Sequence, residues 1–224
     1  MVGYITFFVL LLIAAGVNAA ERMNGLVEVP ALHANLNAGG PDTPRGPVVL
    51  FTEPSLQAPV AVVVRDRKHL ESREHGYGQV SAVVYDIKYH LDVPWYKLRY
   101  SDGKNEMFAW LNQANAGQFR MYYDLVAKSL THFTDAWDKR VYQLPEASAP
   151  FTRYDQFGRY KSVAVAGARY GKDLKDLWLL VVIVDGSICH GPDGPDGNTI
   201  LATGWVPAYA ENGSETVWYS SRGC

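Results

Sequence analysis

Short stretches of alternating polar and apolar residues dominate the middle of the chain. Leu98 and Tyr100 alternate with two basic residues, a period of two that is typical of an antiparallel strand with one buried face. The Asp-Gly pair that follows, at residues 102–103, is a hairpin signal because both residues tolerate positive φ. Three further segments predict strands because they are rich in apolar and β-branched residues: 80–85 (VSAVVY), 163–166 (VAVA) and 178–184 (WLLVVIV). Residues 178–184 are apolar throughout, so we expect this strand to be covered on both faces.

Helical character is confined to one short segment, residues 122–130 (YYDLVAKSL). The rest of the pattern consists of short strands with turn signals every 8 to 12 residues or so, which is typical of small barrels or sandwiches. We therefore expect an all-β protein with one short helix between two groups of strands.

An apolar run without charge opens the chain at residues 4–17. It is shorter than a membrane span and has the length of a signal-peptide core. Small residues around residues 17–19 predict cleavage after Ala19 or Ala20, although no Lys or Arg precedes the run. Export to the periplasm or the medium is the favoured interpretation, with no stable membrane span after cleavage, and the alternative is an uncleaved anchor.

The remainder of the chain repeats itself. Residues 51–59 (FTEPSLQAP) align without gaps on residues 142–150 (YQLPEASAP). Further on, seven positions run from a tryptophan to an Asp-Gly pair in both copies, from Trp95 and from Trp178. Each copy then ends on a second tryptophan strand, residues 109–111 (AWL) and 204–206 (GWV). Three matches in the same order predict two homologous domains of about 80 to 90 residues, a usual size for a small domain.

These motifs resemble the closing half of bacterial SH3-like domains, over residues 48–209 in two copies. The second copy departs from the pattern because it has 12 more residues between its two tryptophans, 27 positions against 15. The resemblance implies two tandem small SH3-like β-barrels that bind cell-wall or protein ligands outside the cytoplasm, without catalysis. The resulting expected division of the chain is a signal peptide (1–20), a Pro/Gly-rich lead-in (21–47), barrel 1 (48–121), a helical linker (122–136) and barrel 2 with a carboxyl-terminal strand (137–224).

Composition narrows the functional classes. The 224 residues carry 21 Lys and Arg against 23 Asp and Glu, a formal charge of −2. This balance gives no electrostatic reason to expect a nucleic-acid partner. A hydrophobic fraction of 48% argues against wholesale disorder.

Two cysteines, Cys189 and Cys224, are too few for a four-cysteine metal site. In an exported protein an even count predicts one disulfide, which would close about 36 residues and contribute roughly 4 kcal/mol. The alternative is a catalytic thiol beside His190, but adjacent residues of a strand point to opposite faces. We expect the disulfide.

Ligand contacts are expected from aromatic and charged residues near the predicted loops. Tyrosine and tryptophan rings can stack on sugars or hold a peptide, whereas Trp95 and Trp178 lie in regular strand patterns and are expected in the core. The charge-rich residues 65–75 either form a specificity loop or pair among themselves in solvent. The predicted ligand-binding residues are Tyr77, Tyr96, Trp110, Glu71, Arg73 and Tyr209.

Motifs for catalysis or cofactors are missing. The six histidines form no zinc-protease spacing, and there is no nucleophile elbow, phosphate loop or dinucleotide fingerprint. Residues 189–199 contain Asp and Asn oxygens but lack calcium-loop spacing, so no metal or cofactor is predicted. The sequence thus favours a non-catalytic exported protein that binds peptidoglycan or a peptide. Alternatives are an adaptor or inhibitor subunit of an envelope complex and, less favoured, a wall hydrolase with an unrecognised site.

Overall fold

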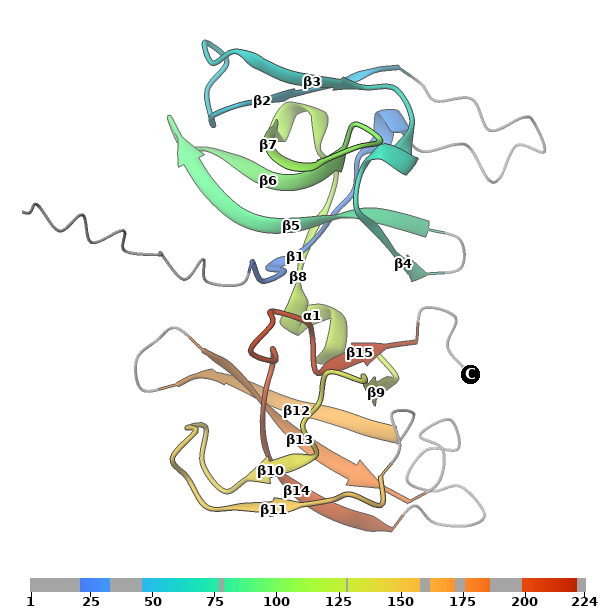
Figure 1. Cartoon of the computed structure of the whole chain (residues 1–224), viewed down its shortest axis with the longest axis vertical. Helices are drawn as coiled ribbons and strands as arrows, with labels where there is room; N and C mark the ends of the chain where they lie inside the picture. The colour runs from blue at the N-terminus through green and yellow to red at the C-terminus, as the bar shows by residue number, and fades with distance from the viewer. Residues whose placement is uncertain are drawn as a thin grey trace, which may run out of the picture.

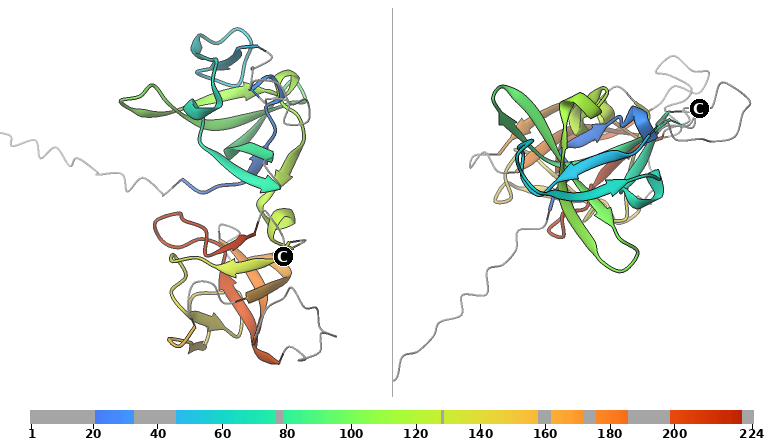
Figure 2. Two further views of the ribbon diagram at one scale, coloured as in Figure 1. Left: turned by 90° about the vertical axis from the view of Figure 1, so that its right-hand side faces the viewer. Right: turned by 90° about the horizontal axis from the view of Figure 1, so that it is seen from above.

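A computed structural model describes residues 21–32, 46–76, 79–127, 129–157, 162–171, 176–185 and 199–220. The molecule has two lobes stacked along its long axis with one short helix between them (Figure 1). Seen from above, one lobe overlies the other (Figure 2). Within these residues the structure has one α-helix and otherwise strands and short 3-10 turns, and all the strand pairings are antiparallel. The all-β prediction is confirmed at this level.

Lobe 1 is drawn in blue to green in Figure 1, and the burial pattern of residues 93–101 shows the predicted alternation. Leu98 and Tyr100 are buried, while Lys97 and Arg99, which alternate with them, are half-buried on the other face. Gly103 has φ of +90° in the following hairpin, as the Asp-Gly signal indicates. The elements of lobe 1 are β1 (Gly25–Val27), η1 (Pro30–Leu32), β2 (Val48–Phe51), β3 (Val60–Val64), η2 (Arg67–His69), β4 (Ser72–Gly76), β5 (Gln79–His90), β6 (Val93–Ser101), β7 (Glu106–Asn112), η3 (Gln113–Asn115) and β8 (Phe119–Met121).

Helix α1 (Tyr122–Ala127) follows β8 directly and leads into lobe 2, drawn in yellow to red. It is six residues long and is the α-helix expected between the two copies. The strands of lobe 2 are β9 (Thr131–Phe133), β10 (Arg140–Tyr142), β11 (Phe151–Arg153), β12 (Ser162–Tyr170), β13 (Leu177–Val184), β14 (Ile200–Pro207) and β15 (Val217–Tyr219).

Strand order is the same in the two lobes. Lobe 1 has the order β3-β2-β7-β6-β5-β1-β8, with β4 as an extra strand on β5. Lobe 2 has the order β11-β10-β14-β13-β12-β9-β15. Strand by strand, each position in the second list is the counterpart of the same position in the first. The internal repeat seen in the sequence is therefore a repeat of topology.

Register and aromatic packing repeat as well. Phe51 lies opposite Trp110 in lobe 1, and Tyr142 lies opposite Trp205 in lobe 2. The ring of Phe51 meets Trp95 edge to face at 5.6 Å between centroids, and that of Tyr142 meets Trp178 edge to face at 5.2 Å. Trp95 and Trp178 are 1% and 4% exposed, so both are core residues as expected.

The nine-residue turn motif folds identically in both copies. The amide of Thr52 donates to the carbonyl of Pro59 at 3.0 Å, and that of Gln143 donates to Pro150 at 2.9 Å. Two further bonds inside each turn also match. A bulge interrupts β5 between Val84 and Asp86, and β12 has its bulge at the corresponding place. Local sequence similarity thus corresponds to local geometry.

Two short strands lie within segments that the sequence pattern assigned to the lead-in and to the linker. β1 pairs with both β5 and β8, and β9 pairs with both β12 and β15. Each is the first strand of its lobe and lies between a long central strand and the last strand of that lobe. Both are only three residues long.

The hydrophobic core does not stop at the lobe boundary. One cluster of buried residues occupies most of lobe 2, continues through α1 and includes Met23, Leu26 and Val83 of lobe 1. A small separate cluster in lobe 2 contains Tyr142, Ala149 and Trp178. A second cluster fills the rest of lobe 1. Burial of this shared apolar surface stabilises one arrangement of the lobes.

Candidate binding cleft

Tyrosine side chains dominate the contacts between the lobes. Tyr122 of α1 is 1% exposed, and its hydroxyl donates to the carbonyl oxygen of Val217 at 2.5 Å. The hydroxyl of Tyr209 in lobe 2 donates to the backbone carbonyl of Met23. The hydroxyl of Tyr219 donates to the backbone carbonyl of Glu74 at 3.2 Å. Burial raises the pKa of all three phenols, that of Tyr219 to about 12. The phenols therefore stay protonated and act as donors across the boundary.

Charged side chains add contacts at the rim of this interface. Arg22, ahead of β1, lies 2.5 Å from a carboxylate oxygen of Asp176 and stacks over the ring of Tyr209. Arg73 of β4 lies 3.7 Å from Glu215 and 5.3 Å from the centre of the Trp218 ring. These groups are partly exposed, so each pair contributes little by itself. Together with the tyrosines they fix the orientation of the two lobes.

A cleft of about 740 Å³ opens between the lobes, a size within the usual range of small-ligand sites. Both lobes contribute the same hairpin to it. Tyr89 and Pro94 face each other in the β5–β6 hairpin, and Tyr170 and Leu177 face each other at the corresponding rung of β12–β13. The cleft is lined by Arg22, Asn24, Ile87, Tyr89, Pro94, Tyr96, Phe119, Met121, Tyr122, Tyr123, Ala168, Arg169, Tyr170, Leu177 and Tyr209.

Exposed rings form the rim of the cleft, and buried rings form its floor. Tyr89 is 73% exposed and Tyr170 is 54% exposed. Tyr96 on the floor is 5% exposed, stacks on Phe119 and donates its hydroxyl to Gln113 at 2.5 Å. The described lining residues include no Asp or Glu. The surface offered to a ligand is therefore mainly aromatic and apolar, with phenolic hydroxyls and the guanidinium groups of Arg22 and Arg169 as its polar groups.

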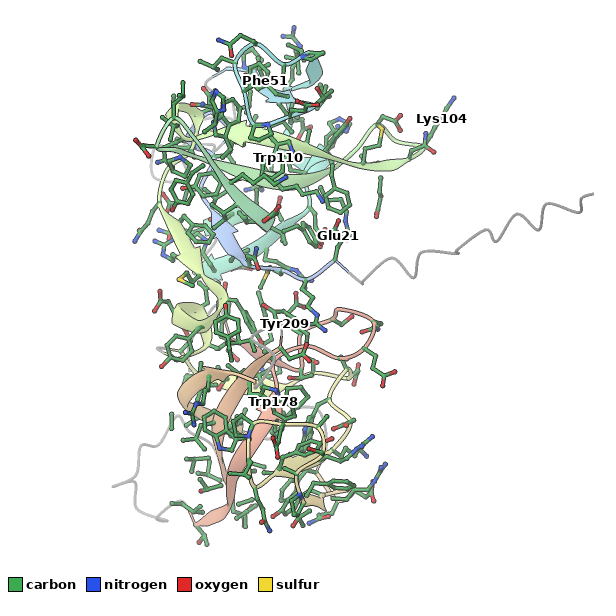
Figure 3. All side chains as sticks on the ribbon, turned by 90° about the vertical axis from the view of Figure 1, so that its left-hand side faces the viewer. Glu21, Phe51, Lys104, Trp110, Trp178 and Tyr209 are labelled. Carbon is green, nitrogen blue, oxygen red and sulfur yellow. The ribbon has the colours of Figure 1, made fainter. Side chains whose placement is uncertain are left out.

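A second cleft of about 700 Å³ lies beside the first and is confined mainly to lobe 2. The two clefts share Arg22, Leu177 and Tyr209. Figure 3 shows Tyr209 at the boundary between the lobes and Trp178 deeper in lobe 2. The wall of the second cleft carries charged groups and an indole, among them Asp138, Arg140, Trp178 and Glu211.

Of the residues predicted to bind ligand, the structure brings Tyr96 and Tyr209 together in the first cleft. Trp110 lies inside lobe 1, 7% exposed and covered by the ammonium group of Lys88 at 5.1 Å. It is not among the residues that line the cleft. Tyr77 lies outside the described residues.

The charged run of residues 65–75 divides into short elements that pair mostly with other parts of the molecule. Glu71 lies 3.4 Å from Arg99 and accepts a hydrogen bond from Tyr85 at 2.5 Å. Arg73 pairs across the lobe boundary with Glu215. Lys68 pairs locally with Asp66 at 3.0 Å. Glu71 and Arg73 thus hold strands and lobes in place, away from the cleft lining.

A Ser–His pair that no sequence motif indicated lies in lobe 1. The hydroxyl of Ser81 is 3.0 Å from Nδ1 of His75, and Nε2 of the same ring is 3.1 Å from a guanidinium nitrogen of Arg120. Because arginine only donates, Nε2 must accept and Nδ1 carries the proton. The imidazole therefore donates to Ser81, which is 1% exposed, and this pair lacks the proton arrangement of a nucleophile and its base.

Several sequence predictions fall outside the described residues, namely the signal peptide, both cysteines and most of the 189–199 insertion. Within the described ranges, no group of three or more His, Cys, Asp and Glu side chains is placed to hold a metal ion. No helix in these ranges has the length and apolar character needed to cross a membrane.

The chain was compared with protein-family models, curated proteins and solved structures, and none of the three comparisons finds a match.

Proposed function

We propose that this chain is an exported, non-catalytic binding protein built from two tandem SH3-like barrels, which takes up peptidoglycan or a related peptide ligand in the cleft between them. The repeated strand order supports two copies of one small domain, with the first strand of each copy between its last strand and a long central strand. The repeated Trp and Asp-Gly motifs support the SH3-like assignment of that domain. The apolar segment at residues 4–17 supports export.

The observation that carries the proposal is the pairing of Tyr89 and Tyr170 on the two sides of one cleft. They occupy matching positions in the two copies, and both are largely exposed. Most exposed large apolar side chains of a single domain need no functional explanation. Two matching rings facing one cleft form a surface on which successive units of a chain-like ligand can stack.

Ligand chemistry follows from the lining. Tyrosine rings present an apolar face to sugar rings or aliphatic side chains and a hydroxyl to their polar groups. Because the described lining has no carboxylate, the cleft does not repel the acidic groups of a wall peptide. An uncharged glycan or a peptide with acidic groups fits this surface better than a basic peptide does.

Co-sedimentation with insoluble peptidoglycan tests the proposal. The double variant Tyr89→Ala/Tyr170→Ala removes both rim rings, whose exposure makes them dispensable for folding. Stacking contacts of this kind contribute about 0.5–1.5 kcal/mol each, so loss of the pair should weaken binding by about fivefold to about a hundredfold. Tyr96 is unsuitable for this test because it is buried.

The control is Leu56→Ala/Leu144→Ala, which removes one exposed apolar side chain from the turn motif of each lobe. The control should sediment like the unaltered protein. Absence of sedimentation by the unaltered protein would reject the wall ligand and leave a protein partner as the remaining candidate. Equal losses in the variant and its control would reject the cleft as the binding site.

A further inference from the structure

The β2–β3 hairpin at the top of lobe 1 presents an uncharged outer face (Figure 1). Val49 lies opposite Val63, and Phe51 lies opposite Val60. Val60 is 54% exposed and Val63 is 44% exposed. Five consecutive apolar residues, VAVVV, make up strand β3. A monomer gains nothing from exposing these side chains to water.

Lobe 2 has different residues at the corresponding cross-strand pair. The cross-strand pair Val49–Val63 corresponds to Arg140–Arg153, because Phe51 corresponds to Tyr142. Each arginine has its own carboxylate partner at 2.8 Å, Asp138 for Arg140 and Asp155 for Arg153. Charged residues at a sheet edge are a common protection against pairing with another chain. One copy of the domain thus has this protection, and the other lacks it.

β3 is also the terminal strand of its sheet. Its described partner is β2 alone, so one side of its backbone has no strand partner within the described part of the chain. β3 has five residues, whereas its counterpart β11 has three and includes Arg153. A longer uncharged edge with unpaired N–H and C=O groups is a template for an additional strand.

We propose that a second copy of this chain occupies this edge, with the two β3 strands antiparallel about a two-fold axis. The occupant must be an extended strand, because the groups left unpaired are backbone donors and acceptors. It must also be uncharged over five residues, and β3 itself meets both requirements. With Val62 of each copy at the axis, Arg65 of one copy faces Pro59 of the other, so no like charges meet. A two-fold contact of this kind closes on itself.

Dimerisation through β3 does not involve the ligand cleft, because no residue of the β2–β3 hairpin lines it. The two proposals can therefore fail separately. In the dimer the two sheets become continuous, and each molecule keeps its cleft open for ligand.

Sedimentation velocity over about 1 to 100 µM, where association of a modest interface becomes visible, tests the proposal. The unaltered protein should move from monomer towards dimer. Val63→Arg introduces the residue that stands at the corresponding position of lobe 2, so it is compatible with the fold. It should weaken association by at least about tenfold through like charges near the axis.

Thr152→Arg is the matched control, because Thr152 is the exposed middle residue of β11. It should leave association unchanged. Hydrogen exchange supplies a second readout: amides in residues 60–64 should exchange more slowly as concentration rises. A protein that stays monomeric with concentration-independent exchange overturns the proposal. Unchanged dimerisation of Val63→Arg, or open-ended larger assemblies, overturns it as well.

Discussion

Removal of the Tyr122 side chain should destabilise both lobes together. The phenol is 1% exposed, donates to the carbonyl of Val217, and packs at 5.3 Å from the Tyr209 ring and 6.1 Å from the Trp218 ring. Tyr122→Phe leaves the carbonyl without this donor, a cost of about 1–2 kcal/mol. Tyr122→Ala also removes the ring and should cost about 3–5 kcal/mol. In a domain pair of this size each kcal/mol lowers the Tm by about 2–4 °C.

Denaturant unfolding, monitored by 19F resonances of fluorotryptophan, reports on each lobe separately, with Trp110 in lobe 1 and Trp178 in lobe 2. Because the apolar cluster crosses the boundary, the free energy of unfolding reported by each of the two resonances should fall by the same amount in Tyr122→Ala. The neighbouring half-buried Tyr123 provides the control, since Tyr123→Phe should change stability by less than about 0.5 kcal/mol. A shift confined to Trp178 would show that the lobes unfold independently and would refute the reasoning.

Four further outcomes follow from the structure and the sequence. The raised pKa of Tyr219, about 12 against 10.0 when unfolded, means that the folded state keeps a proton which the unfolded state loses. The contribution of the Tyr219 hydroxyl to the free energy of unfolding is therefore complete below pH 10 and falls between pH 10 and 12. In a plot of the free energy of unfolding against pH, Tyr219→Phe should flatten that part of the curve. Burial lowers the pKa of His132 below 6.5, so stability should fall on acidification below pH 6.5; an unaltered acid slope in His132→Gln would contradict this. Leu91 is 85% exposed and has φ of +50° in the β5–β6 turn, a conformation that glycine adopts without strain. Leu91→Gly should therefore raise the free energy of unfolding by about 0.5–1 kcal/mol, and a lower Tm in thermal melts would contradict the strain argument. Intact mass should rise by two hydrogen atoms when a thiol reductant reduces the Cys189–Cys224 bond predicted from sequence, whereas free thiols in the native protein would exclude that bond.

Features encoded within a few residues could be predicted from the sequence. The alternation around Leu98 and the Asp-Gly turn after it depend on neighbouring residues only, and both appear in the structure as expected. The nine-residue turn motifs have matching hydrogen bonds because the same backbone conformation recurs with the same Pro and Ala positions. The aromatic pairs of Trp95 and Trp178 follow from the repeated register.

Features that depend on distant pairing could not be predicted. β1 has three residues, too few for a periodic pattern, and is stabilised by partners far along the chain in β5 and β8. β9 is stabilised in the same way by β12 and β15. The contacts of Arg73 with lobe 2 likewise depend on how the lobes meet, which local charge patterns do not determine.

The rim residues Tyr89 and Tyr170 escaped sequence reasoning for a simple reason. Tyr89 lies six positions before Trp95, whereas Tyr170 lies eight positions before Trp178. The hairpin in the second copy is two residues longer, so an ungapped alignment anchored on the tryptophans does not match the tyrosines. Cross-strand register restores the match, since Tyr89 faces Pro94 and Tyr170 faces Leu177.

Titration of 3-fluorotyrosine-labelled protein with soluble peptidoglycan fragments tests the central claim most directly. Resonances are assigned by single Tyr→Phe substitutions at Tyr89 and Tyr170. If the cleft binds the ligand, these two resonances should shift together and give one common Kd. Fragments that bind while both resonances stay in place, or that shift only resonances outside the cleft, would contradict the account.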